Sequence, residues 1–234
     1  LRENCDNGKN KFDIVSWYNW TTFDLIGDLM FGEPFDCLAD MNYHPWVRIL
    51  FESIKAATIF STTSLFPGAQ TVIMALAPKK LIETRDYHQG LTVQKVKTRL
   101  DRVTDRADFM TYILRHNDER GMSVPEIEAT ANAIIIAGSE TTATLLSGVT
   151  YYLLKNEGVL KKLVKEIRHS FPTEEEITLI GVGKLKSLLA VLDEGLRMYP
   201  PVPVGLPRKI PAQGTIINGQ WVPPKVRLLS AILS

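Results

Sequence analysis

The spacing of apolar and polar residues predicts helices along most of the chain. Four segments in the first half have the apolar period or the charge pattern of helices, and they lie at 12–30, 44–60, 79–103 and 108–115. Between them, Ser61–Pro78 has no regular period and contains Pro67-Gly68, which favours an irregular connection. The first half of the chain is therefore predicted to be helical.

The longest predicted helix begins near Ser123 and runs to about Asn156. Ser123 and Glu126 form a capping box, and Pro125 occupies a first-turn position that tolerates proline. At 1.5 Å per residue such a helix is roughly 50 Å long. We therefore expect it to cross the whole molecule.

After this helix the pattern predicts more helix and then a change to β-structure. The next helices lie at 159–169 and 184–199, separated by a turn-rich connection at 174–183. Prolines at positions 200, 201, 203, 207 and 211 end the helical part. Thr215–Val222 is predicted to form a β-hairpin with Asn218-Gly219 as its turn. The fold class is therefore mostly α.

One segment is long and apolar enough to be a membrane span. Ala129–Leu154 carries a single charge, that of Glu140. Asn132, two serines and five threonines interrupt the segment, however. A carboxylate near the centre of a bilayer costs roughly 2.5 kcal/mol or more. A long buried helix in a soluble core is the favoured interpretation.

Composition excludes several functional classes. Lys and Arg total 27 against 26 for Asp and Glu, so the formal charge is +1, which argues against nucleic acid as the main partner. Cys5 and Cys37 are too few and too far apart for a disulfide framework or a zinc cluster. The four histidines are scattered along the chain. No metal site is predicted from these residues.

The middle of the long helix has a sequence that suits a helix poorly. Gly138 costs about 1 kcal/mol relative to alanine there, and two β-branched residues follow it. Ala137 and Gly138 leave a surface on which a flat ligand could lie. The Thr141 hydroxyl can reach back to the Ala137 carbonyl, which bends a helix and can open a pocket. Glu140 stands beside that hydroxyl, and such a pair can pass protons.

An alternative explains the same six residues without a ligand. A stripe of small side chains also forms where two helices cross closely, and Glu140 could then belong to an ion pair in the core. The motif alone does not choose between the two explanations.

A second motif follows at a suitable distance. Glu194 and Arg197 are three residues apart and so lie on one face of a helix, and Tyr199-Pro200-Pro201 ends that helix. Alone, an exposed pair of this kind is common and weakly stabilising.

Together the two motifs resemble those of the cytochrome P450 family. Ala137-Gly-Ser-Glu-Thr-Thr142 is similar to the [AG]-G-x-[DE]-T-[TS] signature of the distal helix, and Glu194-Gly-Leu-Arg197 to the E-x-x-R of the K helix. Phe12–Phe35 is similar to the E-helix region of fungal secondary-metabolism members, and Asn218–Pro223 to the hairpin after the K helix. The resemblance implies a partial fold, from the E to the K helix plus a short β-hairpin. Residues 1–234 would form a single incomplete domain, with no resemblance in residues 226–234.

The resemblance also implies roles for residues of the two motifs. Glu140 and Thr141 would be the acid–alcohol pair that guides protons to the oxygen being activated. Ala137 and Gly138 would border the haem (heme) and its oxygen pocket. Glu194 and Arg197 would belong to a structural network on the proximal side of the haem.

Residues after the K helix receive expected roles in the same way. Val202, Val204 and Leu206 would contact substrate, and Arg208 would pair with a haem propionate, because a fixed cation suits a carboxylate. Ser61–Pro78 would be the F–G loop, which in membrane-bound relatives often touches the bilayer.

The implied activity is a haem-dependent monooxygenation. The whole protein would use dioxygen and electrons from NADPH–cytochrome P450 reductase to oxidise a small apolar secondary metabolite at the endoplasmic reticulum membrane, although this chain shows no anchor. The haem-binding loop F-x-x-G-x-R-x-C-x-G is not found, and neither Cys5 nor Cys37 lies in a matching sequence. Because a thiolate ligand promotes O–O cleavage, we expect this chain alone to be inactive.

Two further expectations remain open. Both ends of the sequence look like cuts, which a truncated gene model, an out-of-frame tail or a pseudogene would explain. The alternative function is a non-catalytic helical interaction or membrane-associated protein that uses the long helix as a scaffold.

Overall fold

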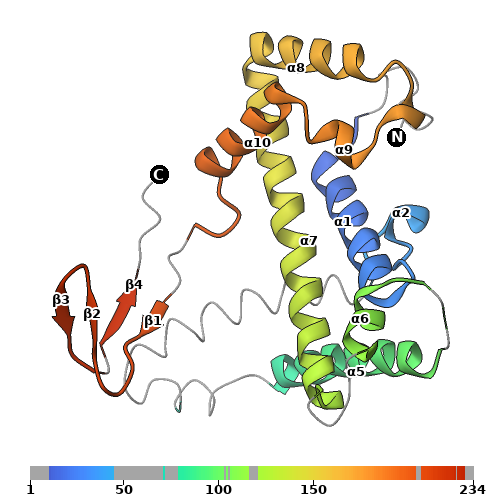
Figure 1. The fold of residues 1–234 in the computed structure, drawn as a ribbon. Helices are drawn as coiled ribbons and strands as arrows, with labels where there is room; N and C mark the ends of the chain where they lie inside the picture. Colours follow the sequence, from blue (N-terminus) through green and yellow to red (C-terminus); the bar gives the residue numbers. More distant parts are fainter. Residues whose placement is uncertain are drawn as a thin grey trace. The chain divides into compact units, whose positions relative to one another are not determined.

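The computed structural model describes residues 11–44, 71, 79–102, 104, 106–115, 121–203, 207–224 and 226–229. Within these ranges the protein is mostly helical, with two short two-stranded sheets (Figure 1). The chain divides into two compact units, residues 1–143 and 144–234. Most of the segments predicted at 44–60 and 61–78 lies outside the described residues.

The first unit begins with α1 (Ile14–Phe31), which matches the helix predicted at 12–30. Asp13 caps its start by accepting a hydrogen bond from the Val15 amide at 3.0 Å. The helix ends at Gly32, whose φ of 70° is left-handed and therefore suits glycine. Both ends of α1 are thus set by residues next to them in the sequence.

The first unit also contains α5, α6 and the first part of α7. The bounds are Lys79–Asp101 for α5, Phe109–Arg115 for α6 and Val124–Lys155 for α7, which continues into the second unit. One cluster of buried side chains joins them to α1, and its largest fully buried members are Phe23, Met30, Phe31, Val96, Met110, Ile127 and Ile135. This cluster is the hydrophobic core of the unit.

A short helix, α2 (Cys37–Asp40), is attached to α1 by one carboxylate. Asp24 accepts hydrogen bonds from the amides of Phe35, Cys37 and Leu38 at 3.2, 2.9 and 2.9 Å. The side chain of Asp36, at the N-cap of α2, makes no capping hydrogen bond. Asp24 of α1 therefore caps the start of α2, 13 residues later in the sequence. Cys37, the first residue of α2, is buried.

A buried ion pair connects α5 to α6. Arg99 donates from Nε to Asp108 Oδ2 at 2.7 Å and from Nη2 to Oδ1 at 2.9 Å, and the two side chains are 5% and 0% exposed. Arg99 Nη2 also donates to the Thr111 hydroxyl at 2.9 Å. Nearby, Arg102 donates to the Phe31 carbonyl at 2.7 Å, at the end of α1. Arginine side chains thus hold α1, α5 and α6 together.

The long helix α7 begins at the predicted capping box. The Ser123 amide and hydroxyl both donate to Glu126 Oε2, at 2.8 and 2.7 Å. The helix contains 32 residues, which gives a length of about 48 Å. The predicted start and length of this helix are both confirmed.

The second unit contains the end of α7 and the helices that follow it. They are α8 (Glu157–Ser170), the 3-10 turn η2 (Glu174–Glu176), α9 (Leu179–Val182) and α10 (Lys186–Met198). Gly195 lies against Val149, so closely that a Cβ at residue 195 would collide with the valine side chain. Gly148 is covered in the same way by the Tyr199 ring. Two glycines therefore allow α10 and α7 to approach closely.

Two antiparallel strand pairs complete the second unit. The pair β2 (Thr215–Ile217) and β3 (Gln220–Val222) is the predicted hairpin, and its turn residues have φ values of 49° at Asn218 and 77° at Gly219. The other pair joins β1 (Pro207–Lys209) to β4 (Arg227–Leu229). The stretch after residue 225, for which no structure was predicted, therefore supplies a strand.

Candidate functional site

The motif at residues 137–142 of α7 contains the hydrogen bond predicted from its sequence. Thr141 Oγ1 donates to the Ala137 carbonyl at 2.6 Å. The hydroxyls of Ser139 and Thr142 donate to carbonyls four residues earlier in the same way, at 2.6 and 3.2 Å. The helix is continuous through this region despite the three side-chain bonds.

Gly138 lies against a side chain of α1. A Cβ at this position would lie 2.7 Å from Ile26 Cδ1, in the middle of α1. The absence of a side chain therefore allows α1 and α7 to cross closely, which was the alternative explanation. Ile26 occupies the space to which a Cβ at residue 138 would point, and the predicted role of Gly138 beside a flat ligand stays a prediction.

Ala137 and Thr141 lie on a more open face of α7. Ala133 and Ala137 are exposed and Thr141 is partly exposed, whereas Ile135 and Ser139 are fully buried. Positions 133, 137 and 141 are four residues apart and so share one face. Within the part of the chain that the structure describes, these three positions carry only three methyl groups and a hydroxyl. Such a face can accommodate a planar group, and Glu140, which is partly buried, adjoins it.

The second motif forms a two-pronged ion pair, as its spacing predicted. Arg197 donates from Nε to Glu194 Oε2 at 2.8 Å and from Nη2 to Oε1 at 2.7 Å. The hydrogen bond from Arg197 holds the pKa of Glu194 below its usual value, and the pKa of Arg197 is raised in turn. Both side chains are more than half exposed, at 59% and 54%. The pair is therefore available to further partners.

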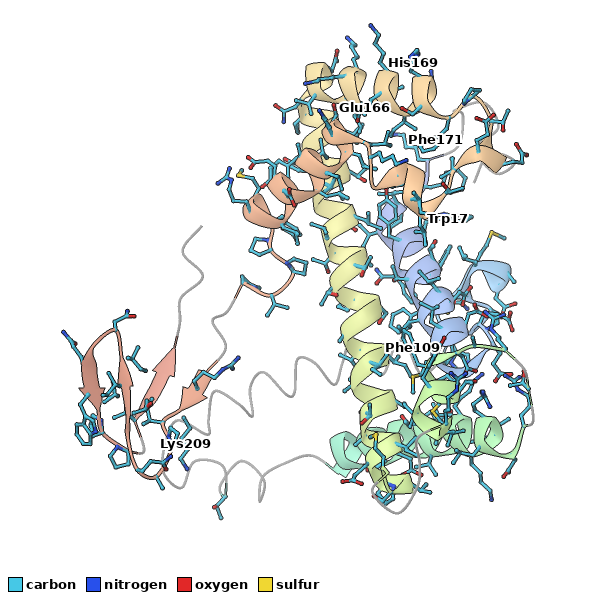
Figure 2. The ribbon with its side chains drawn as sticks, in the orientation of Figure 1. Trp17, Phe109, Glu166, His169, Phe171 and Lys209 are labelled. Atoms are coloured by element: carbon cyan, nitrogen blue, oxygen red, sulfur yellow. The ribbon has the colours of Figure 1, made fainter. Side chains whose placement is uncertain are left out.

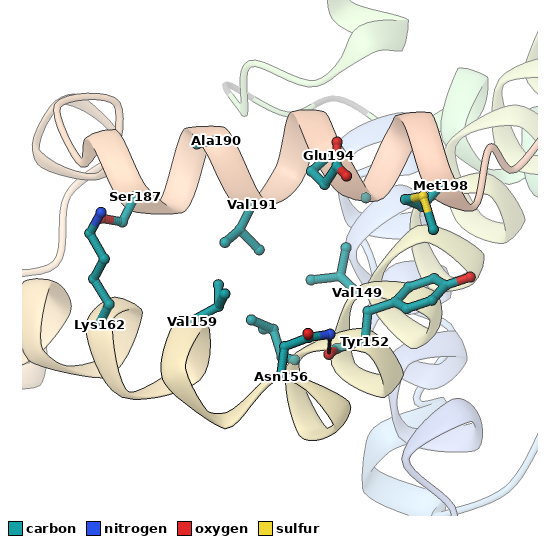
Figure 3. A pocket seen from close by; sticks show the side chains of 12 residues that line it. Val149, Tyr152, Asn156, Val159, Lys162, Ser187, Ala190, Val191, Glu194 and Met198 are labelled. Atoms are coloured by element: carbon teal, nitrogen blue, oxygen red, sulfur yellow. Dashed lines mark hydrogen bonds between the residues drawn. The ribbon is translucent and has the colours of Figure 1, made fainter. Parts of the chain in front are cut away.

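A pocket of about 410 Å³ adjoins this pair, between α7, α8 and α10 (Figure 3). Val149, Val159 and Val191 point into it, and Glu194 and Lys162 lie at its edges. The sequence did not predict this pocket. Gly195, next to Glu194, was the available signal, because a glycine inside an amphipathic helix often marks close packing.

The start of α10 is held by a residue that the sequence also did not single out. Glu166 on α8 lies beside α10 (Figure 2) and accepts hydrogen bonds from the amides of Ser187, at 3.1 and 2.9 Å, and Leu188, at 3.2 Å. No local pattern could have predicted it, because 21 residues separate Glu166 from Ser187.

The remaining predicted residues lie in the second unit. Arg208 is exposed on β1, opposite Leu228 of β4. Val202 is exposed after the end of α10. Val204 and Leu206 lie outside the described residues. The predicted contacts of these four residues with substrate and haem stay predictions.

Cys37 is unsuited to ligate a metal where it lies. Its side chain is buried in the core of the first unit, and this burial raises the pKa of the thiol to about 11. Among the residues with described positions, no group of three or more His, Cys, Asp or Glu could hold a metal ion.

By length and composition α7 could cross a membrane. Ile127, Ala131 and Ile135 of this helix belong to the buried cluster of the first unit, however. The core helix of a soluble protein has the same properties, so this feature alone does not indicate a span.

Comparison with known proteins decides the family. The model of the cytochrome P450 family matches residues 1–234. The chain belongs to this family. Its named relatives, which are monooxygenases and a hydroxylase, are oxidoreductases. The match includes residues 226–234, for which no resemblance was predicted.

Fungal monooxygenases are among the most similar relatives of this P450. It is 46% identical over 224 residues to cytochrome P450 monooxygenase astA from Talaromyces wortmannii, covering 95% of this chain and 45% of that protein. It is 45% identical to averantin hydroxylase from Dothistroma septosporum, covering 95% and 42%. The chain thus spans about half the length of the curated relatives it matches.

A solved structure confirms the fold class. The crystal structure of the cytochrome P450DA heme domain superposes with a TM-score of 0.75 at 20% identity, covering 96% of this chain and 48% of that one. The predicted mostly α, partial P450 fold is therefore confirmed.

Proposed function

We propose that residues 1–234 form the distal and central part of a haem monooxygenase that oxidises a small apolar secondary metabolite. The observation that carries this proposal is the Thr141 hydroxyl, bonded to the Ala137 carbonyl on an open face of small side chains, with Glu140 next to it. The similarity to fungal monooxygenases and to a hydroxylase supports the reaction class.

Four groups of residues would hold the haem and the substrate. Ala137 and Thr141 border the haem on the face of α7 that carries only small groups, whereas Gly138 is assigned to packing against Ile26. The Arg208 guanidinium pairs with a propionate. Val202, Val204 and Leu206 contact the substrate. Glu194 and Arg197 would support the region that holds the haem, and a thiolate ligand would come from outside residues 1–234.

When bound, haem supplies the activation of dioxygen, and the chain itself manages protons. Thr141 Oγ1 directs its hydrogen to the Ala137 carbonyl, so the oxygen lone pairs can accept a hydrogen bond from a neighbouring acid or water. The Glu140 carboxylate next to it exchanges protons with solvent. After rotation, the Thr141 hydroxyl would donate its hydrogen into the open space beside the small side chains as it accepts another from the acid or water, so the residue relays one proton and ends unchanged.

The whole protein needs partners that follow from this chemistry. We propose NADPH–cytochrome P450 reductase as the electron donor and the endoplasmic reticulum membrane as the location. The small apolar substrate would partition into that membrane and reach the site from there.

Paired threonine variants test the proposal. In a full-length protein that contains residues 1–234, Thr141→Ala should lower the product formed per NADPH consumed by at least about tenfold, a lower bound beneath the usual contribution of roughly 10²–10⁴-fold from a positioned proton donor. NADPH consumption should continue and release hydrogen peroxide. Thr142→Ala is the matched control, since its hydroxyl makes a similar back-bond on the same helix, and it should keep the wild-type ratio.

Two outcomes would contradict the proposal. Equal product ratios in both variants would remove the proton role from Thr141. A full-length protein that binds no haem would instead favour the non-catalytic helical scaffold, an alternative supported by the length and apolar character of α7.

A further inference from the structure

The start of α10 lacks a cap from its own sequence. Leu185 occupies the N-cap position and makes no side-chain hydrogen bond. The first amide of this region that bonds to a carbonyl four residues earlier is that of Leu189, which donates to Leu185 at 3.0 Å. The amides of Ser187 and Leu188 therefore need an acceptor from elsewhere.

Glu166 supplies that acceptor from the neighbouring helix. Both of its carboxylate oxygens lie within 3.1 Å of the Ser187 nitrogen, and Oε2 is 3.2 Å from the Leu188 nitrogen. A carboxylate also suits this end of a helix, because the helix dipole is positive there. One side chain of α8 thus replaces the missing cap of α10.

The other end of α10 is fixed by close packing. Gly195 allows the helix to lie directly on Val149, and Tyr199 covers Gly148, both on α7. Eight residues separate Ser187 from Gly195, which is roughly 12 Å along the helix axis. A helix held at two such points can neither slide nor rotate, whereas release of one point leaves it free to pivot about the other.

We propose that Glu166 is a positioning residue for the Glu194–Arg197 pair. By fixing the start of α10 on α8, Glu166 determines the position of the Glu194–Arg197 pair relative to α8. The significance of that position for haem rests on the proposed function, but the positioning itself is a property of the 234-residue chain. It can therefore be tested without haem.

Nuclear magnetic resonance of the isotope-labelled chain gives two separate signals. Amide hydrogen exchange at Ser187 and Leu188 reports the cap itself. The chemical shifts of Gly148 report the position of the Tyr199 ring at the opposite end of α10, because an aromatic ring shifts the protons it covers. A residue that only caps the helix would change the first signal and leave the second unchanged.

Three variants of Glu166 distinguish the effect of side-chain length from the effect of charge. In Glu166→Ala, the exchange protection at Ser187 and Leu188 should fall by about fivefold to tenfold, which is the effect expected from losing an N-cap. The Gly148 signals should shift in the same variant. Glu166→Asp keeps the charge but is one methylene shorter, so it should show both changes. Glu166→Gln keeps the length and one carbonyl acceptor, so it should retain most of the protection and the wild-type shifts.

Glu157→Ala is the matched control, because it removes a carboxylate of the same helix whose contact is an exposed pair with Lys161. It should change neither signal. The proposal is overturned if Glu166→Asp loses exchange protection at Ser187 and Leu188 while the Gly148 chemical shifts stay unchanged. It is also overturned if Glu166→Asp gives the wild-type result for both signals. If the alanine variant fails to fold by circular dichroism, the aspartate variant decides. Haem binding is measured separately, so failure here leaves the proposed function standing.

Discussion

Replacing Arg99 by methionine should destabilise the first unit strongly. The change keeps an unbranched apolar stem but removes both hydrogen bonds to Asp108. Among the described residues, the Asp108 carboxylate would keep only the two bonds from Thr111, with its side chain 0% exposed. A buried charge that loses its partner costs roughly 3–5 kcal/mol. We expect a loss of that size in the free energy of unfolding at neutral pH.

The effect should depend on pH in a defined direction. Burial raises the pKa of Asp108, but the hydrogen bonds from Arg99 and Thr111 outweigh it, so the pKa of the folded state lies below the ordinary value of 3.8. Asp108 therefore stabilises the fold fully above that value and loses this contribution as the pH falls through the lower pKa of the folded state. The difference between wild type and Arg99→Met should be largest near neutrality and shrink in acid.

Urea titration of the chain, followed by tryptophan fluorescence, measures this difference. Arg106→Met is the matched control, because Arg106 pairs with Asp28 at the surface, where the side chains are 49% and 33% exposed. An exposed pair contributes at most about 1 kcal/mol. If Arg99→Met costs no more than Arg106→Met, the reasoning from burial is refuted.

Two further predictions concern the first unit. Gly138→Ala should lower the free energy of unfolding by about 1–3 kcal/mol, because the new Cβ meets Ile26; Gly90→Ala, which meets nothing within 4 Å, should not, and equal urea midpoints would contradict the crossing of α1 and α7. In a Cys5→Ser variant at about pH 8, the buried Cys37 thiol, with a pKa of about 11, should resist a thiol reagent until urea is added. Rapid labelling of the native protein would show that Cys37 is not buried.

Local chemistry explains which elements could be predicted from the sequence. The start of α7 depends on Ser123 and Glu126, and the hairpin turn depends on Asn218 and Gly219, so each is decided within a few residues. The Thr141 hydroxyl bond spans four residues and was predicted for the same reason. The remaining helices could be predicted from the period of their apolar residues, because this signal requires only a continuous apolar face.

Contacts between distant residues could not be predicted in this way. A glycine inside a helix allows close approach of either a ligand or another helix, and its sequence does not reveal that Ile26 packs against Gly138. The cap that Glu166 places on α10 joins residues 21 positions apart, with no sequence pattern to mark it. The pairing of β4 with β1 is likewise a tertiary event. These contacts determine how the site is built.

The most direct test of the central claim is a carbon-monoxide difference spectrum of the reduced protein. The claim is that the small-residue face of α7, with Ala137 and Thr141, exists to lie against a haem. A full-length protein that contains residues 1–234 should show a thiolate-type Soret band, and the 234-residue chain alone should not. A full-length protein that folds but shows no such band would contradict the account.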